Sequence, residues 1–88
     1  MKIFGYMGPN DENVSRVSWK MWKIERSGRV VTTWWGPATV VKRKLVPRYA
    51  LNTKSRSFRT EDAARKFEAG RIADKLAGGY ERFSMGRR

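Results

Sequence analysis

The chain of 88 residues contains no cysteine and no histidine. Without cysteine it forms no disulfide and offers no thiolate to a metal ion. Without histidine it lacks the commonest general base and the commonest zinc ligand. No P-loop, dinucleotide-binding glycine motif or nucleophile elbow is present. The adjacent carboxylates Asp11-Glu12 and Glu61-Asp62 are expected in a solvated loop and at a helix start. We therefore expect no enzymatic activity, no metal and no cofactor.

Long apolar runs are also missing. The opening stretch "MKIFGYMGPN" reaches glycine and proline quickly, which is typical of neither a signal peptide nor a membrane span. The length suits one domain, 1–88, with a modest core that an aromatic content of 12% helps to fill. We expect a soluble cytoplasmic, nucleoid-associated bacterial protein with its core in 14–82 and a flexible basic tail at 83–88.

Acidic residues are scarce, and the middle of the chain has none. Twenty Lys and Arg stand against eight Asp and Glu, a net charge of +12, and no acid lies between Glu25 and Glu61. Such a field attracts polyanions, nucleic acid first. The basic residues of this interval, which we expect to contact phosphates, are Arg26, Arg29, Lys42, Arg43, Lys44, Arg48, Lys54, Arg56 and Arg59.

An anionic membrane surface is the second polyanion that such a charge suits. Membrane binding of this kind needs a basic amphipathic helix. The only good helical segment carries Glu61, Asp62, Glu68 and Asp74. We therefore expect no membrane partner, and we do not count this helix as the basic element.

Strand patterns fill the first two thirds of the chain. We expect a short strand at 1–7, a loop at 8–13, extended chain from Val14, and a hairpin turn at Ser27-Gly28. Pro37 should end its strand or place it at a sheet edge, since proline donates no ladder hydrogen bond. A further strand at 38–46 stops at Pro47, a loop covers 47–55, and a short strand follows at 55–59 with Phe58 inward.

The hairpin turn predicts which side chains lie on which face. A two-residue turn at Ser27-Gly28 sets Ile24 opposite Val31 and Trp22 opposite Thr33. One face then holds the expected core: Trp22, Ile24, Val31, Thr33 and Trp35. The other is a mixed face: Trp19, Met21, Lys23, Glu25, Val30, Thr32 and Trp34.

The last third begins with a helix. Thr60 is a good N-cap, and Glu61 and Asp62 follow in the first turn, where the helix dipole favours acids. The pattern continues through "EDAARKFEAGRIADKLA" and ends at Gly78-Gly79. We expect an α+β fold in which a small antiparallel sheet of about four strands carries one C-terminal helix on one face.

The ordered pattern of the chain resembles a known family. "KMWKIERSGRVVTTWWGP" gives an aromatic-x-Ile strand, a short turn and a strand ending in Trp-Gly. "SRSFRTEDAARKF" gives Phe, a capped helix start and Ala-x-x-x-Phe, and "ADKLAGGYER" gives Lys-Leu-x-x-Gly-Tyr. Over roughly 17 to 82 this resembles the WGR domain, above all the small stand-alone bacterial members.

The resemblance implies a sheet with a helix on one face, and a DNA-binding role. In poly(ADP-ribose) polymerases, WGR domains bind DNA at a strand break and grip the 5′ end. Trp35 matches the tryptophan that packs against the terminal nucleotide, and Gly36 matches the glycine that lets the backbone come close. Pro37 replaces the family arginine, and Thr39 replaces a glycine.

Three functions are compatible with these features. The first is a non-enzymatic nucleic-acid-binding domain, for DNA ahead of RNA, in which Trp34 or Trp35 stacks on a base and favours ends, nicks or single strands. The second is a protein-interaction module that docks to a larger nucleic-acid enzyme or to a second copy through Trp19, Met21, Val30 and Trp34. The third is RNA binding, which no RNA-specific motif marks.

Overall fold

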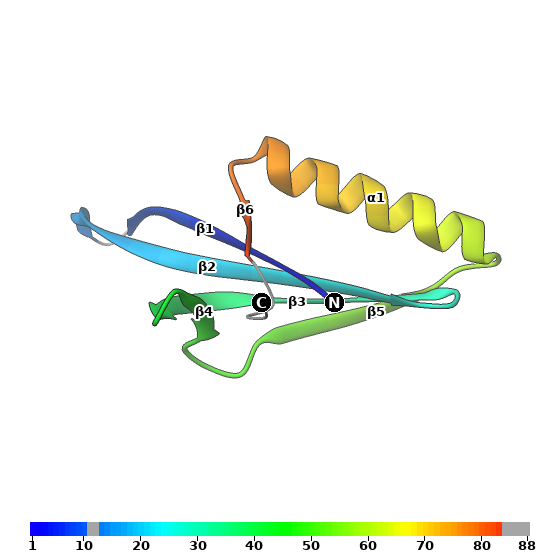
Figure 1. Ribbon diagram of the computed structural model, residues 1–88, viewed down its shortest axis with the longest axis horizontal. Helices are drawn as coiled ribbons and strands as arrows, with labels where there is room; N and C mark the ends of the chain where they lie inside the picture. The colour runs from blue at the N-terminus through cyan, green and yellow to red at the C-terminus, as the bar shows by residue number, and fades with distance from the viewer. Residues whose placement is uncertain (11–12, 84–88) are drawn as a thin grey trace.

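The computed structural model describes residues 1–10 and 13–83 and has the predicted α+β fold: an antiparallel sheet with one C-terminal helix against it (Figure 1). The strands outnumber the expected four. The elements are β1 (Lys2–Asn10), β2 (Asn13–Ser27), β3 (Val30–Val41), β4 (Lys44–Pro47), β5 (Asn52–Ser57), α1 (Glu61–Ala77) and β6 (Glu81–Phe83).

The sheet is built from successive antiparallel neighbours in the order β4-β3-β2-β1-β6, and β5 pairs with the same edge of β3 as β4. Two expected loops are strand instead. Residues 8–10 extend β1 and Asn13 begins β2, while β5 starts at Asn52 within the segment predicted as loop. Phe83, placed by the sequence in a flexible tail, pairs with Ile3 in β6. The remainder of that tail lies outside the described residues.

The β2–β3 turn lies one residue later than predicted. Gly28 and Arg29 form it, with Gly28 at φ 60°, and Ser27 pairs with Val30. Each cross-strand partner therefore moves by two positions, so that Ile24 faces Thr33 and Trp22 faces Trp35. A shift of two keeps every side chain on its predicted face, since side chains alternate along a strand.

The helix-covered face holds the main core, as predicted. Its fully buried residues are Phe4, Trp22, Ile24, Val31 and Ala64, with Phe58, Phe67, Ile72 and Tyr80 packed around them. The Phe4 and Trp22 rings lie 5.5 Å apart, centroid to centroid. The prediction that Trp35 is part of the core is wrong: it is 39% exposed, against 2% for Trp22.

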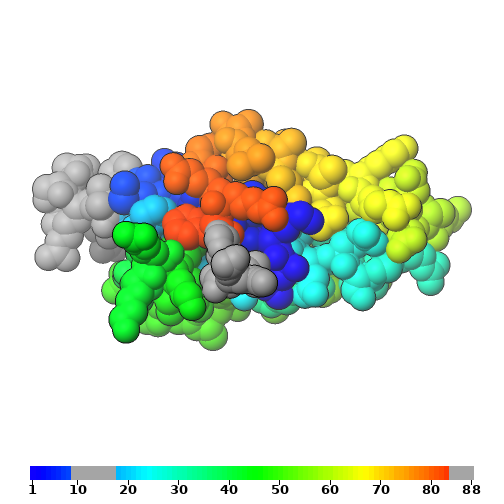
Figure 2. All heavy atoms as spheres, viewed as in Figure 1, coloured from blue at the N-terminus to red at the C-terminus, as the bar shows by residue number. Residues whose placement is uncertain are grey.

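A second, smaller core lies on the opposite face, where the sheet curls. Met21 is buried there between Gly5 and Gly36, its neighbours on the two adjoining strands. A Cβ on Gly5 would stand 2.7 Å from the Phe83 ring and 2.8 Å from a Leu45 methyl. Phe83 and Leu45 come from β6 and β4, the two ends of the strand order, which lie next to each other in Figure 2.

The second core covers most of the predicted docking face. Met21 is 2% exposed, and Trp19 is half-buried with its ring edge-on to Phe83, 5.5 Å between centroids. Trp34 is half-buried, with the Lys23 ammonium 5.3 Å from its ring centroid. Of the four residues expected to dock a partner, Val30 alone is classed as exposed.

The sequence predicts that Pro37 ends its strand or lies at a sheet edge. It does not end β3, and the second alternative holds locally, at a break in the edge that pairs with β4 and β5. It pairs with Lys20 inside the ladder, and β3 continues to Val41. The Pro37 carbonyl accepts from the Arg48 backbone N–H at 3.0 Å, so its nitrogen also points toward the β4 and β5 edge. Pro37 lies between the two partner strands on this edge of β3: pairing with β5 ends at Trp35, and pairing with β4 begins at Ala38. The missing N–H therefore costs no bond to β2.

The helix has the predicted boundaries and caps. The Thr60 hydroxyl accepts the Ala63 N–H at 3.0 Å, and the chain leaves the helix at Gly78 and Gly79, the latter at φ 101°. Such an N-cap is worth about 1 kcal/mol. In Figure 1 the C-terminal end of α1 stands clear of the sheet, and Ala64 near the other end is fully buried. The helix packs on the main core through Ala64 near its N-terminal end and through Phe67 and Ile72 farther along.

Candidate nucleic-acid interface

One flank of α1, toward β1 and β2, is electrostatically neutralised. Glu68 lies 3.5 Å from the Lys2 ammonium and 3.5 Å from the Arg26 Nε, and Glu61 lies 3.3 Å from an Arg26 terminal nitrogen. Arg26, one of the predicted phosphate contacts, is thus held by two carboxylates. We infer that the ion pairs of this flank, including those of Arg26, stabilise the fold.

The opposite flank of α1 faces β5 and is basic. Phe67, Arg71 and Lys75 follow one another at a spacing of four, which places them on one side of the helix. Lys54 and Arg56 of β5 pair with Thr33 and Val31, and strand pairs share a face, so both point to the helix-covered side.

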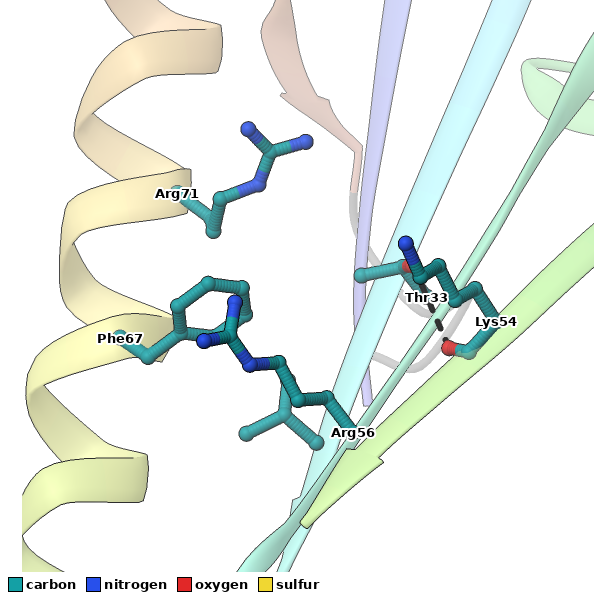
Figure 3. A pocket seen from close by; sticks show the side chains of 6 residues that line it. Thr33, Lys54, Arg56, Phe67 and Arg71 are labelled. Atoms are coloured by element: carbon teal, nitrogen blue, oxygen red, sulfur yellow. Dashed lines mark hydrogen bonds between the residues drawn. The ribbon is translucent and has the colours of Figure 1, made fainter. Parts of the chain in front are cut away.

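These two elements enclose a hollow of about 290 Å³ lined by Val31, Thr33, Lys54, Arg56, Phe67 and Arg71. Figure 3 shows Arg71 and Phe67 projecting from the helix toward Arg56 and Lys54 on the strand. A neighbouring hollow of about 280 Å³ shares Thr33, Lys54 and Arg71 and adds Trp22, Trp35 and Lys75. We call the space between α1 and β5 lined by Lys54, Arg56, Arg71 and Lys75 the basic groove.

Trp35 stands where the basic groove meets a more apolar hollow. That hollow, of about 390 Å³, is lined by Ser18, Trp19, Lys20, Met21, Trp35, Gly36, Pro37, Asn52 and Tyr80. The Tyr80 ring lies tilted against the Tyr6 ring, with 5.4 Å between their centroids. Trp35 is 39% exposed, and the residues that line the neighbouring hollow with it include the cations Lys54, Arg71 and Lys75.

The groove brings four cations together without a carboxylate in its lining. Among the described residues, no salt bridge involves any of the four. Burial lowers the pKa of the Lys75 ammonium below its ordinary value, the charge of Arg71 lowers it further, and Asp74 opposes both. A bound anion would relieve this repulsion.

Two of the four cations also cover core aromatics. The Arg56 guanidinium lies 5.1 Å from the ring centroids of both Phe58 and Phe67. The Lys75 ammonium lies 5.4 Å from the Trp22 centroid and 5.0 Å from that of Tyr80. These contacts contribute to folding as cation–π interactions. Lys54 and Arg71 have no such aromatic contact to another described residue.

The predicted binding residues separate into four places. Lys54, Arg56 and Trp35 border the basic groove. Arg26, Arg29 and Arg59 gather at the β2–β3 turn, where an Arg29 guanidinium nitrogen donates to the Arg59 carbonyl at 3.4 Å. Lys42, Arg43, Lys44 and Arg48 belong to the β3–β4 hairpin or follow it directly. Trp34 points to the opposite face from Trp35.

Arg71 and Lys75 were missed by the sequence analysis, which discounted the helix because it carries acids. Glu61 and Glu68 face the sheet cations Lys2 and Arg26, whereas Arg71 and Lys75 line the basic groove, where no carboxylate is present. A signal was available: Ala64, Phe67, Arg71 and Lys75 form one stripe at spacings of three and four, apolar first and basic afterwards. Such a stripe indicates a helix that packs at one end and presents charge at the other.

No protein family model, no curated protein and no solved structure matches this chain. The WGR resemblance therefore stays a prediction. Within residues 1–10 and 13–83, no group of three or more His, Cys, Asp or Glu side chains is arranged to hold a metal ion. No helix in the same part of the chain has both the length and the apolar composition to cross a membrane.

Proposed function

We propose that this protein is a non-enzymatic nucleic-acid-binding domain whose binding site is the basic groove. The observation that supports this most is the convergence of Lys54, Arg56, Arg71 and Lys75 beside an exposed tryptophan, with no carboxylate in the lining. Like charges gathered in one groove repel one another, and a phosphate backbone supplies the missing counter-charge.

The groove favours a single strand over a plain duplex. It has two walls, α1 and β5, and an extended phosphate backbone lies between them more readily than a double helix. Trp35 at the end of the groove would stack on a base, a contact worth roughly 1–3 kcal/mol. The bases of a plain duplex are stacked inside the helix, so they do not offer that face.

DNA is the preferred nucleic acid because the WGR resemblance favours it, and RNA is the alternative. Phosphate contacts alone do not separate the two, because both carry the same backbone charge. The second candidate of the sequence analysis, docking of a protein through Trp19, Met21, Val30 and Trp34, loses support because Met21 is buried.

The test compares two double variants that remove the same charge. Lys54→Gln with Arg71→Gln changes the groove. Arg65→Gln with Lys66→Gln changes the outer side of α1, where both cations are exposed and form surface pairs with Glu61 and Asp62. Binding of a labelled single-stranded oligonucleotide is followed by fluorescence anisotropy at several salt concentrations.

The groove variant should lose about 1.4 from the slope of log K against log salt, because each phosphate contact to a single strand contributes about 0.7. Near physiological salt this corresponds to a loss on the order of tenfold in affinity. The outer variant should change little. Equal losses in the two variants would show that only net charge matters and would overturn the groove as the site.

A further inference from the structure

The β3–β4 hairpin has a turn that its residues do not favour. Val41 pairs with Lys44, so Lys42 and Arg43 alone form the turn, with φ of 52° and 68°. A two-residue turn with both φ angles positive is usually made by Asn-Gly, because side chains with a Cβ are strained in this region. Lys42 and Arg43 place two long cations at the tip at the expense of stability.

Strain of this kind concentrates at functional positions. The hairpin around the tip is also unusually exposed. Lys44 is exposed beside the turn, and Val41 and Val46 remain 49% and 38% exposed. Just beyond the hairpin, Tyr49 is 67% exposed, with the Arg48 guanidinium 5.9 Å from its ring centroid. The segment carries no acid, since none lies between Glu25 and Glu61.

The base of the hairpin adjoins the apolar hollow at the end of the basic groove. The Arg48 N–H donates to the Pro37 carbonyl, and Pro37 lines the same hollow as Trp35. A strand that leaves the groove past Trp35 therefore reaches the hairpin next.

We propose that the β3–β4 hairpin is a second nucleic-acid contact that binds double-stranded DNA. This inference rests on the proposed function and names its substrate: a duplex with a single-stranded extension. The major groove of B-DNA admits a two-stranded β-ribbon. Lys42, Arg43 and Lys44 contact the phosphates on either side, and the single-stranded extension lies in the basic groove.

The test is the replacement of the strained turn by the sequence that the turn favours, Lys42→Asn with Arg43→Gly. This variant should fold better than the parent, with Tm higher by about 4 °C or more, because it relieves the strain at both positions. If the variant is more stable than the parent and binds DNA more weakly, the loss of binding cannot be caused by misfolding. Three probes are used: a single strand, a blunt duplex and a duplex with a single-stranded extension. The charge-matched control is Arg65→Gln with Lys66→Gln.

The hairpin variant should bind the extended duplex more weakly by a factor on the order of ten, with a salt slope smaller by about 1.8 for two lost duplex phosphate contacts. Its affinity for the single strand should equal that of the control. Equal losses on the single strand and the extended duplex would overturn the inference, as would full retention of extended-duplex binding.

Vesicles with anionic lipid form the last arm of this test. If the variant loses vesicle binding and keeps duplex binding, the hairpin contacts a lipid surface and the inference falls. If the parent protein binds none of the three DNAs, the proposed DNA binding itself fails, and this result differs from a failure confined to the hairpin.

Discussion

The two flanks of α1 use charge in opposite ways. Toward β1 and β2, Glu61 and Glu68 neutralise Lys2 and Arg26. Toward β5, Arg71 and Lys75 face Lys54 and Arg56, with no carboxylate among the residues that line the groove. On both flanks, basic side chains lie between the helix and the sheet. Only the flank toward β1 and β2 also has carboxylates.

The charges on the two flanks of α1 have opposite effects on stability. A half-buried ion pair holds two elements together, whereas a cluster of like charges pushes them apart and costs stability. The helix packs on the main core through Ala64, Phe67 and Ile72, and its cations Arg71 and Lys75 line the groove beside this contact. The charge that we propose binds a polyanion thus lies in a groove beside the packed core.

The largest effect should distinguish two tryptophans that pair across β2 and β3. Trp22→Ala empties the main core and should cost about 3–5 kcal/mol of unfolding free energy. Trp35→Ala removes a side chain that is 39% exposed and should cost much less. Chemical denaturation measures both. For oligonucleotide affinity the order is reversed, with a loss of roughly 1–3 kcal/mol for Trp35→Ala. A Trp35 variant as unstable as the Trp22 variant would contradict the separation.

A smaller effect should distinguish the two flanks directly. Glu68→Gln leaves Lys2 and Arg26 with one fewer carboxylate in a partly buried setting and should lower stability by about 1–2 kcal/mol. Arg71→Gln removes a repelling cation and should leave stability unchanged or slightly raised. Thermal denaturation at low and high salt checks this. Destabilisation by Arg71→Gln would mean that the basic flank also holds the fold together.

The smallest effect concerns the titration of Lys75. Its pKa is lowered in the folded protein by burial and by Arg71, so the unfolded chain binds this proton more tightly. Its contribution to stability therefore rises as pH increases through the lowered pKa toward the ordinary value of 10.5. Arg71→Gln should move the pKa of Lys75 upward, and so should a bound oligonucleotide. NMR of the lysine side chains measures both shifts, and a downward shift on binding would argue against phosphate in the groove.

Much of the fold is predictable from local signals. The helix boundaries are predictable from Thr60, the first-turn acids and Gly78-Gly79. The alternation of side chains predicts the two faces of the sheet, even though the β2–β3 turn is displaced. The β3–β4 turn is not predictable, because Lys42-Arg43 is not a sequence that favours positive φ. The second core is not predictable from the sequence either, because it depends on a curl of the sheet that brings β4 and β6 together.

The candidate site is half predictable. The acid-free interval contains Lys54 and Arg56, and it also contains Arg26, which proves to be ion-paired. The sequence analysis misses Arg71 and Lys75 because it counts charge along the chain. Residues that are neighbours in the sequence of a helix point to different sides, so charge has to be counted for each side of the helix. The charge along the chain thus predicts a polyanion partner, and the proposed place of binding comes from the arrangement of side chains around the helix.

The measurement that tests the basic groove most directly is an NMR titration of the tryptophan indole N–H signals with a short single-stranded oligonucleotide. Trp34 and Trp35 are adjacent in the chain and point to opposite faces, so one serves as the control for the other. We predict that the Trp35 signal shifts on binding and the Trp34 signal stays in place. A shift of Trp34 with Trp35 unmoved would place the nucleic acid on the other face and contradict the proposed site.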